Sequence, residues 1–166
     1  MTRTGFFAGS FDPPTFGHMD LVVRAAGVVD ELVLGIGINA DKTSWLTVEE
    51  RIGLLKELVP TGVDVVAFTG LAVEAARAAG ARVLVRGVRS EADMAGELQM
   101  ALANRRLSPG IETIVLVGSP EVAHISSRLV REVHASDGDV GLFVPPLVAS
   151  ALARRRQGGA PPRSAP

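Results

Sequence analysis

Hydroxyl, imidazole and glycine residues gather in a short segment that follows the first apolar run of the sequence. Residues 9–18 read GSFDPPTFGH. Gly9 allows a ligand to approach the backbone, and Ser10 offers a hydroxyl group. Gly17 and His18 are expected to open a helix, where unpaired amides favour a phosphate and the imidazole can donate to a phosphoryl oxygen. The alternative is a tight turn with a helix-capping histidine. The pattern matches neither GxxxxGK[ST] nor GxGxxG, which disfavours P-loop and dinucleotide-binding folds.

Three later segments carry groups of the same chemical kind. Lys42 follows the second apolar run and can reach a polyphosphate as a point charge, although, taken alone, it is more simply explained as a solvated loop lysine. Arg86 and Arg89 follow the fourth run, and arginine forks match phosphate oxygens. Ser126 and Ser127 are expected to begin a helix, which makes a further anion-binding helix end or an ordinary helix cap.

The apolar pattern predicts the elements that bring these segments together. Expected strands cover residues 4–8, 31–38, 63–68, 82–85 and 113–117, and expected helices cover residues 18–28, 47–58, 71–79, 90–106 and 126–134. Continuous apolar strands that alternate with helices indicate an α/β fold, a doubly wound, five-stranded parallel sheet with helices on both faces. Such folds bind ligands beyond the carboxyl ends of their strands. We therefore expect the four segments to meet in one pocket built for a triphosphate and a second phosphate.

Length and composition narrow the classes of protein. The 166 residues suit one domain, with residues 144–153 closing it, and the 17 basic and 18 acidic side chains give no field that favours nucleic acid or an anionic membrane. Cysteine is absent, which excludes disulfides and thiolate chemistry and fits a cytoplasmic location. No apolar run approaches the ~20 residues of a membrane helix. Residues 158–166 are rich in Gly, Pro and Ala and are expected to form a disordered tail.

Two segments resemble the signatures of the nucleotidyltransferase α/β phosphodiesterase superfamily. GSFDPPTFGH is similar to its T/HxGH motif, and ISSRLVRE at 125–132 is similar to ISSxxVR/K. Together with Lys42, the RGxR segment at 86–89, Glu97 and the 99–104 region, they resemble the phosphopantetheine adenylyltransferase family, from about Thr4 to Ala153. Thr15 stands where nicotinate mononucleotide adenylyltransferases usually carry histidine, which counts against that branch.

The resemblance implies an activity, a fold and a set of site residues. A Rossmann-like nucleotidyltransferase domain over residues 1–157 would pass the adenylyl group of ATP, with Mg²⁺, to 4′-phosphopantetheine in coenzyme A biosynthesis. The family is typically a homohexamer. The implied catalytic residues are His18, Lys42 and Arg89, and the implied acceptor ligands are Ser10, Lys42 and Arg86. The implied ATP contacts are Ser10, Phe11, His18, Gly87, Val88, Arg89, Glu97, Ser126 and Ser127. No dedicated metal ligands are expected, since the sequence shows no carboxylate cage.

The chain departs from the family pattern in the segment that precedes Glu97. The family commonly has D-F-x-Y-E where this chain reads Asp93-Met94-Ala95-Gly96-Glu97, and Arg128 replaces a usual serine. Gly96 inside a helix costs ~1 kcal/mol relative to alanine. An acceptor other than 4′-phosphopantetheine, such as nicotinamide or nicotinate mononucleotide, therefore stays open. A non-catalytic ATP-binding domain is a further alternative, although the retained imidazole and cations argue against it.

Overall fold

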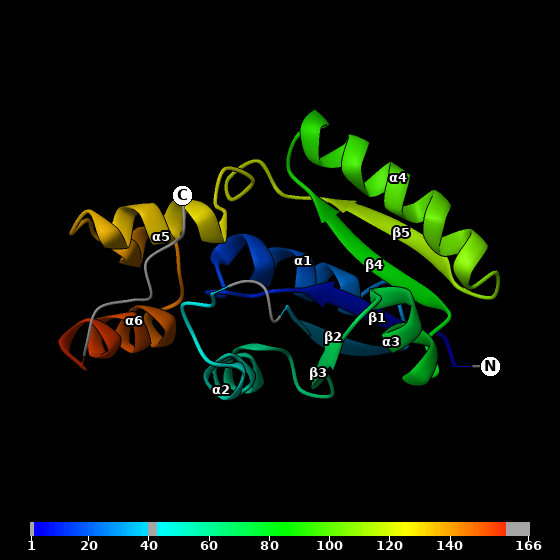
Figure 1. Cartoon of the computed structure of the whole chain (residues 1–166), viewed down its shortest axis with the longest axis horizontal. Helices are drawn as coiled ribbons and strands as arrows, with labels where there is room; N and C mark the ends of the chain where they lie inside the picture. Colours follow the sequence, from blue (N-terminus) through cyan, green and yellow to red (C-terminus); the bar gives the residue numbers. More distant parts are fainter. Residues whose placement is uncertain (1, 40–42, 159–166) are drawn as a thin grey trace.

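Five parallel strands form one sheet at the centre of the computed structural model, which describes residues 2–39 and 43–158. Its spatial order is β3-β2-β1-β4-β5, and neighbouring strands are parallel throughout (Figure 1). The strands are β1 (Thr4–Gly9), β2 (Glu31–Ile38), β3 (Asp64–Thr69), β4 (Val83–Val88) and β5 (Glu112–Val117). The predicted doubly wound α/β fold with a five-stranded parallel sheet is confirmed.

Helices connect the strands and cover the sheet. Phe7 and Leu34 pack on one face beneath α1 and α2, whereas Phe6 and Leu84 pack on the other face against α3. Figure 1 shows α4 lying along β4 and β5. The helices are α1 (Phe16–Ala26), α2 (Val48–Leu58), α3 (Ala72–Ala78), α4 (Glu91–Leu107), α5 (Ser127–Ala135), the 3-10 helix η1 (Val140–Leu142) and α6 (Pro146–Gly158). No helix in the described ranges has both the length and the apolar character needed to cross a bilayer.

The last helices form a second core beyond the carboxyl ends of the strands. Val130 of α5 and Val148 of α6 are fully buried and pack with Leu46, which precedes α2, and with Leu54 of α2. Figure 1 shows α5 and α6 on the side toward which the strand arrows point. The sheet edge that carries the polar segments is therefore walled by α5.

Local capping explains several helix starts. Thr47 and Glu50 form the predicted capping box at α2, and the Ser90 side chain accepts from the Asp93 amide at α4, also as predicted. The α1 boundary was predicted wrongly. Thr15 caps that helix, so His18 lies at its third position instead of its first. At the other end of the chain, Gly158 is the last residue of α6 and does not start the predicted tail, whose other residues lie outside the described ranges.

Candidate active site

The site lies where β1 and β4 part. Their backbone pairing ends at Phe7 and Val85, after which β4 continues to pair with β5 only. Arg86 is the next residue of β4, and its Nη1 atom donates to the carbonyl oxygen of Ala8 at 2.8 Å. The expectation that Arg86 follows the strand is therefore wrong, because β4 runs to Val88 and only Arg89 lies beyond it. The guanidinium enters the crevice between the diverging strands, which is the switch point of the fold.

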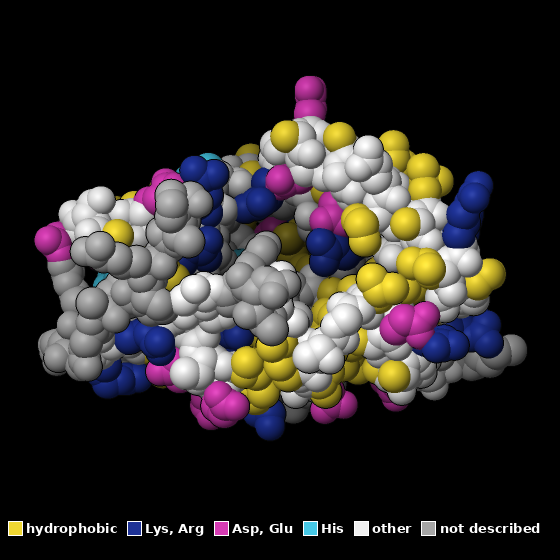
Figure 2. Space-filling view, in the orientation of Figure 1, with side chains coloured by type: hydrophobic (Ala, Val, Ile, Leu, Met, Phe, Trp, Pro, Cys, Tyr) yellow, Lys and Arg dark blue, Asp and Glu magenta, His cyan; other side chains and the backbone are white. Residues whose placement is uncertain are grey.

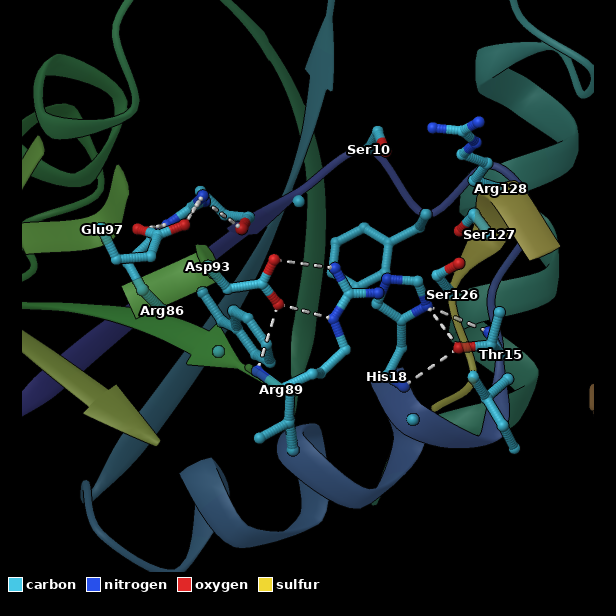
Figure 3. Close-up of a pocket in the computed structure, with 18 of the residues that line it drawn as sticks. Ser10, Thr15, His18, Arg86, Arg89, Asp93, Glu97, Ser126, Ser127 and Arg128 are labelled. Carbon is cyan, nitrogen blue, oxygen red and sulfur yellow. Dashed lines mark hydrogen bonds and ion pairs between the residues drawn. The ribbon is translucent and has the colours of Figure 1, made fainter. Parts of the chain in front are cut away.

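A cavity of about 660 Å³ opens at this point. Figure 2 shows basic and acidic side chains side by side in the hollow between α4 and α5, and Figure 3 shows how the lining residues face one another. Nearly all the predicted site residues that the structure describes line this cavity: Ser10, Phe11, His18, Arg86, Gly87, Arg89, Glu97, Ser126 and Ser127. Val88 does not line it, because its side chain is buried in the core. Lys42 lies outside the described residues.

Backbone contacts orient the His18 imidazole. The Thr15 amide donates to His18 Nδ1 at 3.1 Å, and Thr15 Oγ1 accepts from the His18 amide at 3.3 Å. Because Nδ1 accepts a hydrogen bond, the neutral ring carries its proton on Nε2. The ring packs against Phe11, with 5.0 Å between ring centroids. Gly9 admits that phenyl ring, because a Cβ atom at Gly9 would lie 2.9 Å from its carbons. His18 therefore completes the helix cap, as the alternative interpretation expected, and it also lines the cavity.

The protonation state of His18 follows from its surroundings. Burial, with a smaller contribution from the Arg89 guanidinium, lowers the pKa of His18 from 6.5 to about 4. The imidazole is therefore neutral at physiological pH, and it acts as a hydrogen-bond donor without holding a full charge. Acidification should also destabilise the fold, because between pH 6.5 and 4 the unfolded chain binds a proton that the folded chain excludes.

An NMR titration can check this assignment. In the free protein, the His18 ring is expected to titrate near pH 4, and its nitrogen shifts should report a proton on Nε2 at neutral pH. Saturating ATP should raise the pKa, because phosphate charge favours the imidazolium. The His18→Gln variant assigns the resonance. A free-protein pKa near 6.5 would contradict the half-buried, neutral ring.

Two acidic residues of α4 hold the two arginines. Arg86 donates through Nε and Nη2 to the two carboxylate oxygens of Glu97, at 2.7 and 2.6 Å. Arg89 donates through Nε to Asp93 at 3.0 Å, with a longer Nη2 contact of 3.5 Å. Asp93 was missed as a site residue, although its i+4 spacing from Arg89 could have indicated the pair. Both cations keep further N–H groups for an anionic ligand.

The start of α5 closes the opposite wall of the cavity. The Ser126 side chain caps α5 by accepting from the Leu129 amide at 3.0 Å, and the Ser127 hydroxyl donates to the carbonyl oxygen of Pro13 at 2.8 Å. Arg131 donates to the carbonyl oxygen of Asp12 at 2.5 Å. The two signature segments are therefore joined to each other by hydrogen bonds. Amides and hydroxyls at this helix start face a cavity that already holds two arginines.

Two buried polar residues that the sequence did not reveal brace the loop after β1. The Asp12 carboxylate accepts from the amides of Trp45 and Leu46, at 2.7 and 2.8 Å. Arg51 is only 2% exposed, and it donates to the carbonyl oxygen of Ser10 at 2.8 Å. Neither contact has a local signal, because the partners lie more than thirty residues apart in the chain. These contacts hold the loop that carries Ser10 in place behind the cavity.

The close approach of α1 to the segment before α5 predicts a contrast between two glycines. A Cβ atom at Gly17 would lie 3.0 Å from the Ile125 carbonyl oxygen and 3.2 Å from that of Val122, whereas one at Gly53 in α2 would meet nothing within 4 Å. We expect Gly17→Ala to destabilise the protein by about 1–3 kcal/mol and to lower its activity. Gly53→Ala should stabilise it by about 0.5–1 kcal/mol. Urea unfolding measures both, and a Gly17→Ala variant as stable as the wild type would refute the close packing.

Comparison with known proteins agrees with the geometry. The cytidylyltransferase-like family model matches residues 6–133. A phosphopantetheine adenylyltransferase of Beijerinckia indica subsp. indica is 45% identical over 162 residues, which cover 93% of this chain and 97% of the relative. The enzyme of the same name from Clavibacter michiganensis subsp. michiganensis is 46% identical over 164 residues, covering 95% and 100%.

Solved structures of other proteins share the fold of this chain. A Vibrio parahaemolyticus protein provisionally named a nicotinate-nucleotide adenylyltransferase superposes with a TM-score of 0.67 at 16% identity, covering 93% of both chains. That likeness concerns the fold alone, whereas the sequence relatives match along nearly their whole length. The chain belongs to the phosphopantetheine adenylyltransferases, within the cytidylyltransferase-like family.

Proposed function

We propose that the protein transfers the adenylyl group of ATP to 4′-phosphopantetheine, giving dephospho-coenzyme A and pyrophosphate in cytoplasmic coenzyme A biosynthesis. The observation that carries this proposal is one cavity lined by His18, Arg86, Arg89 and the start of α5, in a chain whose relatives named phosphopantetheine adenylyltransferase match it nearly end to end. The cavity offers cations and N–H donors to more than one phosphate group, as adenylyl transfer requires.

The reaction needs positioning more than it needs a general base. The acceptor is a phosphate monoester with a second pKa near ~6, so its oxygen is anionic at neutral pH. That oxygen attacks the α-phosphorus of ATP, a new P–O bond forms, and the bond to the β-phosphate breaks to release pyrophosphate. The barrier comes from repulsion between anions and from charge that develops on the phosphoryl oxygens. Aligned cations and N–H donors lower it.

The geometry supports a role for each of the described residues. His18 Nε2–H donates to the developing charge at the α-phosphate, and Arg89, the Ser126 hydroxyl and the Ser127 backbone amide at the start of α5 hold the triphosphate. Arg86 holds the acceptor phosphate. Lys42, by family resemblance, bridges the acceptor phosphate and the α-phosphate. Mg²⁺ would be supplied as its ATP complex, since phosphate oxygens are among its preferred ligands.

A pyrophosphate-release assay tests the proposal. We expect turnover with ATP and 4′-phosphopantetheine, and far less with nicotinate or nicotinamide mononucleotide. The mononucleotides are the second candidate acceptors because Gly96 lines the cavity and a Cβ atom there would meet nothing within 4 Å, so the acceptor side is open. Preference for a mononucleotide would reassign the acceptor, and ATP binding without pyrophosphate release with any acceptor would indicate a binding domain.

We propose that the protein forms a homohexamer, as its family typically does, and the outer face of α4 supports self-association. Met94, Leu98 and Leu102 recur every four residues on this helix and are 41, 58 and 58% exposed. Figure 2 shows hydrophobic side chains along the region of α4. We expect light scattering to give a hexamer, and the Leu98→Glu/Leu102→Glu double variant to dissociate it. Val23→Glu, at an exposed position on α1, is the control. A monomeric wild-type protein would contradict the hexamer.

A further inference from the structure

The contacts of Arg86 and Glu97 assign a function to Glu97 beyond the one expected for it. Family resemblance puts Glu97 among the ATP contacts. In the structure both of its carboxylate oxygens accept from Arg86, at 2.6 and 2.7 Å, in a side-on bidentate pair. Distances this short are typical of charge-assisted hydrogen bonds. The Glu97 oxygens therefore already have a strong cationic partner.

A count of the N–H donors of Arg86 shows what remains for a ligand. A guanidinium carries five N–H bonds. Glu97 takes the Nε proton and one on Nη2, and the Ala8 carbonyl takes one on Nη1. One N–H is left on each terminal nitrogen. These two donors remain available to the oxygens of a phosphate. Glu97 therefore does not compete for the donors that a phosphate needs.

The Arg86–Glu97 pair is more buried than the neighbouring Arg89–Asp93 pair, and its contacts are shorter. The Arg86 and Glu97 side chains are 29 and 15% exposed, whereas those of Arg89 and Asp93 are 38 and 29% exposed and meet at longer distances. Arg86 is held by three hydrogen bonds from two elements, α4 and β1. Arg89 is held by a side chain one helical turn away. The Arg86 fork is thus fixed before substrate arrives, while Arg89 has more freedom to adjust to the nucleotide.

Without Glu97, a single hydrogen bond to Ala8 would restrain the Arg86 guanidinium. A phosphate would then have to order a long side chain, which costs conformational entropy on binding. We propose that Glu97 is a positioning residue, which aims the Arg86 guanidinium at the acceptor phosphate. This inference rests on the proposed function and deepens it on the acceptor side.

Steady-state kinetics of Glu97→Gln and Glu97→Ala test the inference. Each change should raise the KM for 4′-phosphopantetheine by about 10- to 100-fold, the size of a lost charge-assisted contact, and should raise it well above any change in the KM for ATP. Asp93→Asn is the matched control and should act on the KM for ATP. A raised KM for ATP with an unchanged acceptor KM in the Glu97 variants would overturn the assignment.

A double-mutant cycle separates positioning from direct contact. If Glu97 acts only through Arg86, adding Glu97→Ala to Arg86→Ala should cause little further loss. Additive losses would show an independent contact and overturn the inference. Urea unfolding of each variant identifies losses that come from misfolding, and Glu97→Asp, which keeps the charge, should recover part of the acceptor affinity.

Failure of the wild-type protein to use 4′-phosphopantetheine would count against the proposed function alone. The Glu97 series would then be run with the phosphate acceptor that does support pyrophosphate release, and the same split between the two KM values is expected. If no acceptor supports release, the inference falls together with the function.

Discussion

His18→Ala is expected to lower kcat by about 10²- to 10³-fold while the KM for ATP changes only a few-fold, because the imidazole meets charge that develops in the transition state. The ring is fixed by the Thr15 amide, packed on Phe11, and held neutral with its Nε2 proton facing the cavity. A donor that is already oriented needs no reorganisation when charge builds up. Pyrophosphate release under saturating acceptor gives both constants.

Two further variants sharpen the assignment of His18. His124→Ala removes an exposed histidine that does not line the cavity, and its kinetics should match the wild type. His18→Asn, whose amide also donates, should recover part of the lost kcat. Loss of ATP binding with unchanged turnover in His18→Ala would show that the residue binds the ground state and is not catalytic in the sense proposed.

Arg86→Ala is expected to raise the acceptor KM by about 100-fold, with a much smaller effect on the KM for ATP. The substitution removes the fork that lies between β1 and β4, and it leaves the Glu97 carboxylate, 15% exposed, without its counter-ion. Arg86→Lys keeps the charge but loses the bidentate geometry, so its acceptor KM should lie between that of the wild type and that of Arg86→Ala. Titration of each variant with 4′-phosphopantetheine at saturating ATP measures the effect. An acceptor KM that stays at the wild-type value in Arg86→Ala would remove Arg86 from the acceptor site.

The predicted elements of the fold follow from patterns that act locally. Apolar runs of strand length separated by helices indicated the parallel sheet, and the capping box of Thr47 and Glu50 located the start of α2. Boundaries that depend on tertiary contacts were predicted less well. The apolar run of the fourth strand stops at Val85, and the predicted strand therefore ends there. The backbone continues as strand to Val88 because β5 pairs with it there.

In the candidate site too, local patterns were informative and tertiary contacts could not be predicted. Residues after successive strands were expected to converge, and those within the described ranges line one cavity apart from Val88. The residues that brace the site could not be identified from the sequence. Arg51 lies on a helix where a charged residue is ordinarily solvated, and its contact with the Ser10 carbonyl arises only once α2 packs behind the loop. The pairing of Glu97 with Arg86 likewise depends on the placement of α4 over β4.

A crystal structure with dephospho-coenzyme A bound would test the central claim most directly, because that product carries both phosphates that the reaction joins. The account predicts that its diphosphate lies in the cavity between His18 and the start of α5, with Arg86 on the phosphate that came from the acceptor. A diphosphate bound outside this cavity, or one that contacts neither His18 nor Arg86, would contradict the account.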